Sequence, residues 1–140
     1  MKLQEVDKKI VIQKAMELVA LAQKSLKMTM NLAEELASPL PAVYFSLLKL
    51  KLDEGIEIKR VGFGLKEDFE TIKKHQALTH PNYSFKHAKS FNYKRMLLID
   101  NTKLLFADDT SGRTFFYTEN STEVAKFFRY FDEEFGTHYA

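Results

Sequence analysis

The sequence contains no cysteine and no tryptophan, and it has only three prolines and five glycines in 140 residues. Without cysteine the chain can form neither a disulfide bond nor a thiolate metal site. An excess of charge of one sign is also missing, because 21 basic and 19 acidic side chains leave a net charge of +2. A dedicated nucleic-acid-binding domain usually carries a stronger basic excess. Composition therefore offers no argument for nucleic acid as the main partner.

Long apolar runs are missing as well. No stretch of the sequence approaches the roughly 20 apolar residues that a helix needs to cross a bilayer. Residues 1–7 are largely polar and lack the apolar stretch of a secretory signal. We therefore expect a cytoplasmic chain without membrane contact. The remaining composition, 45% hydrophobic and 29% charged, is typical of a globular protein, and we expect one domain over residues 1–140.

The hydrophobic spacing in the first half of the chain changes between that of helices and that of strands. Ile12, Met16 and Val19 recur at helical spacing, whereas Leu26 to Asn31 alternate between apolar and polar side chains. This order of helices and strands favours an α/β arrangement with a parallel strand pair. The predicted elements are a helix over 7–24, a strand over 26–31, a helix from Ser38-Pro39 to Gly55, and a strand over 56–61 that Gly62-Phe63-Gly64 breaks.

In the second half, short strands follow one another closely. Asp100-Asn101 is a turn signal between two of them, and the connections are too short for helical crossovers. Asn120 and Glu123 predict a capping box at the start of a final helix. The sequence therefore predicts an α/β fold with a mixed β-sheet flanked by helices. The expected elements are a helix over 66–76, strands over 83–89, 94–99, 104–107 and 114–118, and a helix with a stripe of Val124, Phe127, Phe128, Phe131 and Phe135.

Most familiar site patterns do not occur in this sequence. It has neither the glycine-rich phosphate loop with Gly-Lys nor the Gly-x-Ser-x-Gly turn of a serine nucleophile. Its histidines do not cluster with carboxylates at the spacing of metal ligands. We expect no metal and no cofactor. The four histidines are His75, His80, His87 and His138.

Half of a phosphodiesterase signature occurs at His87-x-Lys89. The full signature has the form His-x-Lys-x4-Asp, and its aspartate position falls on Lys94 in this register. An enzyme that used His87 as its nucleophile would need a rearranged site.

A second register keeps the whole spacing of that signature. Tyr93-x-Arg95-x4-Asp100 is followed, after six residues, by Ala107-Asp108. Residues 96–106 supply an apolar strand, a turn and a second strand around the aspartate. In these features the chain resembles the phospholipase D superfamily, whose spacing continues with Gly-Ser. The resemblance implies a phospholipase D-like fold.

The same resemblance argues against catalysis. In the superfamily the histidine attacks phosphorus and the lysine stabilises the phosphate charge. Tyr93 stands at the histidine position, and Arg95 keeps the charge of the lysine but not its compact ammonium group. Ala107-Asp108 replaces Gly-Ser, and the motif occurs once, whereas the enzymes pair two copies. We expect that this chain is not an enzyme.

A second resemblance covers nearly the full chain. The sequence is similar to the effector domain of archaeal TrmB-type sugar-responsive transcription regulators, in which a phospholipase D-like domain follows a winged helix. No winged-helix segment precedes Asp7, so we expect a DNA-binding partner chain or a missing winged-helix domain. The matching segments are Lys14 to Leu18, Leu52 to Ile58, Arg95 to Asp100, and Tyr117 to Asn120 with the phenylalanine-rich helix that follows.

These patterns suggest a ligand site. On a strand, Tyr93 and Arg95 would face the same side, with Arg95 as the charge anchor for a small molecule or anion. Asn31 ends a strand, and ligands in parallel sheets bind at the carboxyl ends of strands. Asp109 and Ser111 belong to a polar turn that would close the pocket. The alternative is an ordinary strand surface.

Two further features have alternative interpretations. Residues 83–95 mix four aromatic side chains with basic ones, which either bind single-stranded nucleic acid or form an amphipathic strand pair. Asp100 is either a site residue or, by its local hydrogen bonding, a turn former. The leading hypothesis is a non-catalytic ligand-sensing or dimerisation domain associated with transcription control, acting as a homodimer. The alternatives are a phosphodiesterase or nuclease, and a nucleic-acid-binding module.

Overall fold

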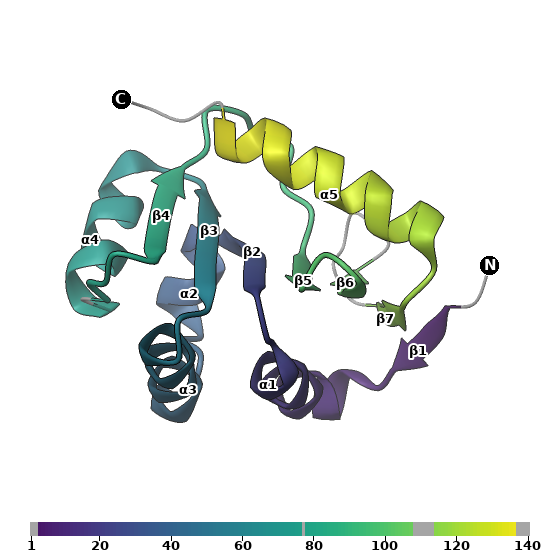
Figure 1. Ribbon diagram of the computed structural model, residues 1–140. Coiled ribbons are helices and arrows are strands. Elements are labelled where there is room, and N and C mark those ends of the chain that lie inside the picture. The colour runs from purple at the N-terminus through teal and green to yellow at the C-terminus, as the bar shows by residue number, and fades with distance from the viewer. Residues whose placement is uncertain (1–2, 77, 108–113, 137–140) are drawn as a thin grey trace.

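A computed structural model describes residues 3–76, 78–107 and 114–136 of this chain. Over these residues the fold is a seven-stranded mixed sheet with helices on both faces, which confirms the predicted α/β class (Figure 1). The strand order is β1-β7-β6-β5-β2-β3-β4. The elements are β1 (Gln4–Val6), α1 (Val11–Leu21), β2 (Ser25–Asn31), α2 (Leu32–Ala37), α3 (Ala42–Asp53), β3 (Glu57–Phe63), α4 (Lys66–Gln76), β4 (Tyr83–His87), β5 (Met96–Ile99), β6 (Lys103–Ala107), β7 (Phe115–Thr118) and α5 (Ser121–Gly136).

The sheet has a parallel half and an antiparallel half that meet at β2. β2 and β3 pair in parallel, as predicted, and so do β3 and β4, with α4 as the crossover between them. β5 pairs antiparallel with β2, and β6, β7 and β1 continue the antiparallel half. β2 is therefore the strand at which the two halves join.

Each face of the sheet has its own core. Alternate side chains of β2, β3 and β5 pack beneath α1 and α3, where Leu18 and Leu48 are fully buried. The opposite face packs against α5 through Phe127 and Phe131 (Figure 1). A smaller cluster around Phe69 joins α4 to α2. No helix within the described residues is long and apolar enough to cross a membrane.

The first helix is shorter than the predicted 7–24. A 3-10 turn, Lys8–Ile10, precedes α1, and the side chain of Asp7 accepts the Lys9 N–H at 2.9 Å to cap it. The chain becomes extended at Ala22, which ends α1 at Leu21. Ile12 was placed on the buried face but is 44% exposed, because the helix turns that face toward a cavity described below.

Two short elements lack any counterpart in the prediction. α2 has six residues, too few to show a helical period, and Asn31 begins it by accepting the Glu34 N–H at 3.0 Å. β1 has three residues and pairs with β7 at the edge of the sheet. Both depend on contacts that alternation or periodicity over a window cannot reveal.

The prediction that Gly62-Phe63-Gly64 breaks the second strand is wrong for its first two residues. β3 continues through Gly62, which pairs with Met30 and His87, and ends only at Phe63. A Cβ atom at Gly62 would lie 2.7 Å from the Leu32 Cδ2 atom. The glycine is needed there because α2 packs directly against the strand. Gly64, with φ +141°, makes the turn that follows.

The later elements agree with the prediction more closely. α4 has the predicted bounds, while β4 ends at His87 and β5 begins at Met96, so both strands are shorter than expected. Asn120 caps α5 by accepting the N–H groups of Thr122 and Glu123. In a capping box the Glu123 side chain would accept the Asn120 N–H. Here that N–H donates to Thr118 Oγ1 at 3.0 Å instead.

Candidate functional site

A cavity of about 480 Å³ lies beside the carboxyl-terminal half of β2, within the size range of small-ligand pockets. α1, α2 and the segment before α3 line one side, and the sheet with residues 93–95 lines the other. The structure brings three of the predicted site residues, Asn31, Tyr93 and Arg95, into this one lining. Asp109 and Ser111 lie outside the described residues.

Tyr93 and Arg95 do not lie on a strand, so the prediction that strand alternation turns both to the same side is wrong. Residues 91–95 have no regular secondary structure and are held by side chains instead. Thr29 Oγ1 donates to the Lys94 carbonyl at 2.6 Å and accepts the Met96 N–H at 3.0 Å. From the other face, the Tyr130 hydroxyl accepts the Lys94 N–H at 2.8 Å. Cross-links from β2 and α5 thus fix both residues at the cavity.

Arg95 already has an ionic partner at this site. Its Nη2 atom lies 2.6 Å from the Glu34 Oε2 atom on the first turn of α2. Burial would lower the pKa of Arg95, but the hydrogen bond and charge of Glu34, with a further contribution from Tyr93 once its phenol ionises, outweigh it, so the pKa is raised. The guanidinium carbon also lies 5.9 Å from the Tyr93 ring centroid and 5.7 Å from that of Phe115. The guanidinium of Arg95 is therefore fixed in place and paired with the Glu34 carboxylate.

Tyr93 offers a neutral hydroxyl. Burial raises the pKa of its phenol to about 12, with Arg95 opposing that shift, so the group keeps its proton at pH 7. Its ring packs 5.5 Å from that of Phe63, centroid to centroid. A phenol in this state can donate or accept a hydrogen bond but is a poor nucleophile.

Asn31 contributes to the cavity by positioning α2. Its Oδ1 atom accepts the Glu34 N–H, which orients the first helical turn and places the Glu34 carboxylate beside Arg95. An N-cap amide is fixed by the helix that it begins. Asn31 thus connects the end of β2 to the cavity wall.

Four charged residues of the lining were not predicted, namely Lys8, Glu34, Glu35 and Arg60, and the last two are buried. Arg60, on β3, is 1% exposed, and Glu35, on α2, is 9% exposed. The parity of Arg60 was an available signal, because it shares the inward-facing positions of Ile56 and Ile58 on an alternating strand. No comparable signal marks Glu35, since α2 itself is too short to predict.

Glu35 is buried with one backbone bond. Its Oε2 atom accepts the Leu40 N–H at 3.1 Å. Burial raises the pKa of this carboxyl, and the Leu40 bond and the charge of Arg60 offset the shift only in part. The charged form of Glu35 is therefore disfavoured at the inner wall of the cavity.

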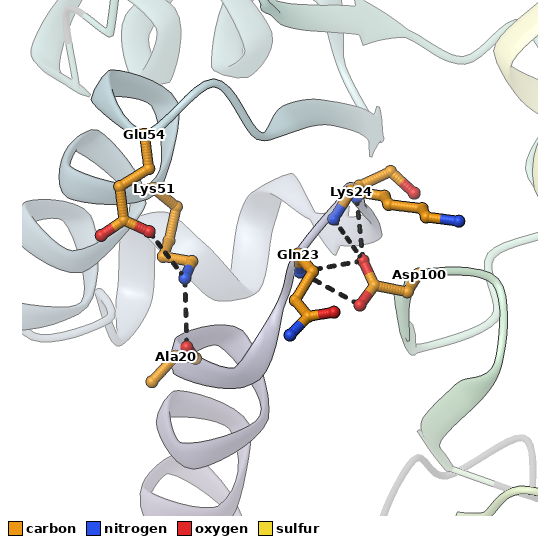
Figure 2. A network of polar contacts seen from close by, with 7 residues as sticks. Ala20, Gln23, Lys24, Lys51, Glu54 and Asp100 are labelled. Atoms are coloured by element: carbon orange, nitrogen blue, oxygen red, sulfur yellow. Dashed lines mark hydrogen bonds and ion pairs between the residues drawn. The ribbon is translucent and has the colours of Figure 1, made fainter.

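At the opposite end of β2, Asp100 performs a structural role (Figure 2). Its carboxylate accepts the N–H groups of Gln23, Lys24 and Ser25 at 2.7–3.2 Å. Asp100 and Asn101 have φ of 53° and 57°, which confirms the predicted turn. The aspartate of the motif spacing thus fixes the loop between α1 and β2.

His87 lies away from the cavity lining. It is buried on β4, its Nε2 atom lies 2.7 Å from the Gly64 carbonyl oxygen, and its ring stacks on Phe69 at 5.1 Å. Since a carbonyl only accepts, this nitrogen is the donor. Among the residues that the structure describes, no group of three or more histidine or carboxylate side chains could hold a metal ion.

The aromatic residues of the 83–95 stretch are placed differently from one another. Phe91 is 87% exposed. Phe85 packs on Phe69, Tyr93 packs on Phe63, and the Tyr83 hydroxyl accepts a hydrogen bond from Arg60. These residues therefore form no continuous row of exposed rings for stacking on bases.

Comparison with solved structures identifies the type of fold. Nuc from Salmonella typhimurium, a phospholipase D family member, superimposes with a TM-score of 0.66 and 7% identity over 99% of this chain and 95% of Nuc. NucT from Helicobacter pylori gives 0.63 and 14% over 98% and 97%. The chain therefore has the phospholipase D-like fold, as the motif spacing implied.

A further similar structure is TrmBL2, described as an archaeal chromatin protein with a novel mode of DNA binding. It matches with a TM-score of 0.69 and 18% identity over 95% of this chain and 51% of TrmBL2, so this chain spans about half the length of that protein. Identities this low establish the fold alone. No family model and no curated protein matches the sequence.

Proposed function

We propose that this chain is a cytoplasmic, non-catalytic ligand-sensing domain associated with transcription regulation. The cavity beside β2 is the observation that carries the proposal. Tyr93 and Arg95 occupy the spacing positions of the superfamily's nucleophile and phosphate-binding cation, and both line a cavity of about 480 Å³. The site thus retains a place for a ligand where the nucleophilic histidine has been replaced.

The chemistry of the lining supports binding rather than bond cleavage. Tyr93 is neutral at pH 7, and Arg95 is held by Glu34. Apolar side chains of α1 and β2, including Ala15 and Met28, form part of the same wall. A mixed lining of this kind suits a small polar molecule with an apolar face, such as a sugar or a sugar phosphate.

The link to transcription is supported by TrmBL2, which shares the fold over 95% of this chain and is described as binding DNA. In this proposal the present chain senses a ligand as a homodimer, and a winged helix or a partner chain contacts DNA. A ligand that binds the folded state alone would stabilise it, and this change could be passed to the DNA-binding part.

Ligand-dependent thermal stability tests the proposal. Purified chain is heated with monosaccharides, sugar phosphates and inorganic phosphate at constant ionic strength. We expect at least one compound to raise the melting temperature, since ligand at 100 times its Kd stabilises by about 2.7 kcal/mol. Arg95→Gln should weaken that response, while Lys66→Gln, an exposed change on α4, should not. A full panel without any shift would contradict ligand sensing.

The non-catalytic part of the proposal needs a separate assay. We expect no hydrolysis of bis(4-nitrophenyl) phosphate above the buffer rate, because neither Tyr93 nor the buried His87 presents a nucleophile in the cavity. Turnover by the wild-type chain that disappears in His87→Ala would overturn this expectation.

A further inference from the structure

Arg60 is the most deeply buried charged side chain of the described residues, at 1% exposure. It lies on β3 in the floor of the cavity. A buried arginine normally has a carboxylate partner, because an unpaired charge is costly to remove from water. No carboxylate of the described residues lies within 4 Å of its guanidinium group.

The partners that Arg60 does have are neutral. Nη1 donates to Gln76 Oε1 at 2.7 Å and to the Tyr83 hydroxyl at 3.2 Å. Nη2 donates to the Met30 sulfur at 3.8 Å, which is a weak acceptor. The buried Nε atom has no hydrogen-bond partner among the described residues. The guanidinium carbon lies 5.6 Å from the Phe45 ring centroid and 5.1 Å from that of Phe85. The site therefore holds a cation whose donors are incompletely used.

The charge balance of the lining points the same way. Arg95 and Glu34 form an ion pair and cancel each other. Lys8 and Arg60 remain, against Glu35 as the single further carboxylate of the described lining. Burial raises the pKa of Glu35, which reduces its negative charge. With Lys8 exposed and Arg60 buried, the cations of the lining outnumber its remaining carboxylate, which suits an anion.

We propose that the floor of the cavity is an anion subsite in which Arg60 binds a carboxylate or phosphate group of a small-molecule ligand. This proposal rests on the proposed sensing function and names the chemical class of its ligand. The anion would replace the Met30 sulfur as the acceptor of Nη2, and a methionine side chain is flexible enough to move aside. Tyr93 and the Arg95–Glu34 pair would then contact the more exposed part of the ligand.

Lys51 provides a matched comparison within the same fold. It is 6% exposed, but its ammonium donates to the Ala20 carbonyl at 3.1 Å and to Glu54 at 3.0 Å (Figure 2). Its bonds stabilise the end of α1, so its replacement should lower stability. Arg60 has the neutral partners Gln76 and Tyr83 but no carboxylate partner, so a neutral side chain of similar length would remove a buried unpaired charge and should not lower stability.

The experiment measures melting temperature and binding heat with inorganic phosphate and succinate, against glucose as a neutral probe, at matched ionic strength. In the wild-type chain we expect an anion to bind and stabilise. Arg60→Met should melt at or above the wild-type temperature without ligand and bind the anion roughly 10- to 100-fold more weakly, as expected for a lost charged hydrogen bond. Arg60→Lys should retain part of the response, and Lys51→Met should melt lower but respond normally.

The outcomes separate this proposal from the sensing function. If Arg60→Met binds the anion as tightly as wild type, or if it melts well below wild type, Arg60 has a structural role and the anion subsite is wrong. If glucose alone stabilises the chain, sensing stands and the anion subsite fails. If neither the anions nor glucose nor any compound of the wider panel binds, both proposals fail.

Discussion

The polar side chains at the two ends of β2 differ in how fully the protein supplies their hydrogen-bond partners. At the amino end, one carboxylate, Asp100, accepts three backbone N–H groups and closes the loop between α1 and β2. At the carboxyl end, the guanidinium of Arg60 and the carboxyl of Glu35 are buried with few partners and without an ion pair to each other. The polar group at the amino end has its partners within the described residues, whereas Arg60 has an unpartnered Nε atom.

This difference suggests that the polar group at the amino end serves folding, while those near the carboxyl end serve binding. A polar group with all its partners inside the protein stabilises the fold, whereas one that is buried with unused donors costs stability. The amino end also retains the aspartate of the motif spacing, while Tyr93 and Arg95 stand at the replaced positions near the carboxyl end. Asp100 therefore has a structural role, whereas Tyr93 and Arg95 line the cavity.

The largest effect on stability should come from a substitution of Asp100 at the amino end of β2. Asp100→Ala removes the acceptor of three N–H groups and places alanine at φ 53°, so we expect a loss of about 2–4 kcal/mol in the free energy of unfolding. Urea denaturation measures it. Asp100→Asn keeps one acceptor oxygen and tolerates this φ, and should lose less than half as much. A loss below 0.5 kcal/mol for alanine, a typical surface value, would refute the structural role.

The pH dependence of stability checks the same residue independently. Desolvation raises the pKa of Asp100, but its bonds to Ser25, Lys24 and Gln23 outweigh that and leave the pKa below its ordinary value. A depressed carboxyl pKa stabilises the fold above the unfolded-state pKa, and the contribution disappears as the pH falls through the folded value. Asp100→Asn should therefore flatten the acid limb of the stability curve.

The pH dependence of stability that comes from Glu35 should have the opposite sign. Burial raises the pKa of Glu35, so its folded state favours the proton, and stability is lost as the pH rises from the ordinary value of 4.5 through the folded value. Glu35→Gln removes that charge and keeps an acceptor for the Leu40 N–H. We expect it to raise the free energy of unfolding at pH 7 and to have no effect at pH 4. Destabilisation at pH 7 would show that Glu35 acts as the counter-ion of Arg60.

The sequence predicts the turn at Asp100-Asn101, but not the bonds from Asp100 to Gln23, Lys24 and Ser25, which lie 75 to 77 residues away. Asp100-Asn101 and the Asn120 cap are visible because their turn and helix signals lie within a few residues. Arg60, in contrast, depends on Gln76 and Tyr83, 16 and 23 residues away, and on the packing of α2. Alternation places Arg60 on the buried face, but only the tertiary structure shows that no carboxylate meets it there.

Three of the predicted site residues lie beside one cavity, but not for the reason that the sequence suggested. Asn31, Tyr93 and Arg95 do line one cavity, but Tyr93 and Arg95 are held there by Thr29 and Tyr130 rather than by strand alternation. These cross-links join segments more than 30 residues apart. No local pattern of the sequence specifies these cross-links.

The smallest effect on stability should come from the ion pair at the edge of the cavity. Glu34 is half exposed, and exposed ion pairs contribute little, so Glu34→Gln should change the free energy of unfolding by less than about 0.5 kcal/mol. Its effect on binding should be clearer. Loss of this carboxylate removes a repulsive charge and frees Arg95, so phosphate should bind several-fold more tightly at low ionic strength. Glu70→Gln on α4 makes the same change in net charge at an exposed position outside the cavity lining and serves as the control. Equal gains in the two variants would mean that net charge alone governs the response, and the contrast between the paired Arg95 and the unpaired Arg60 would then have no bearing on binding.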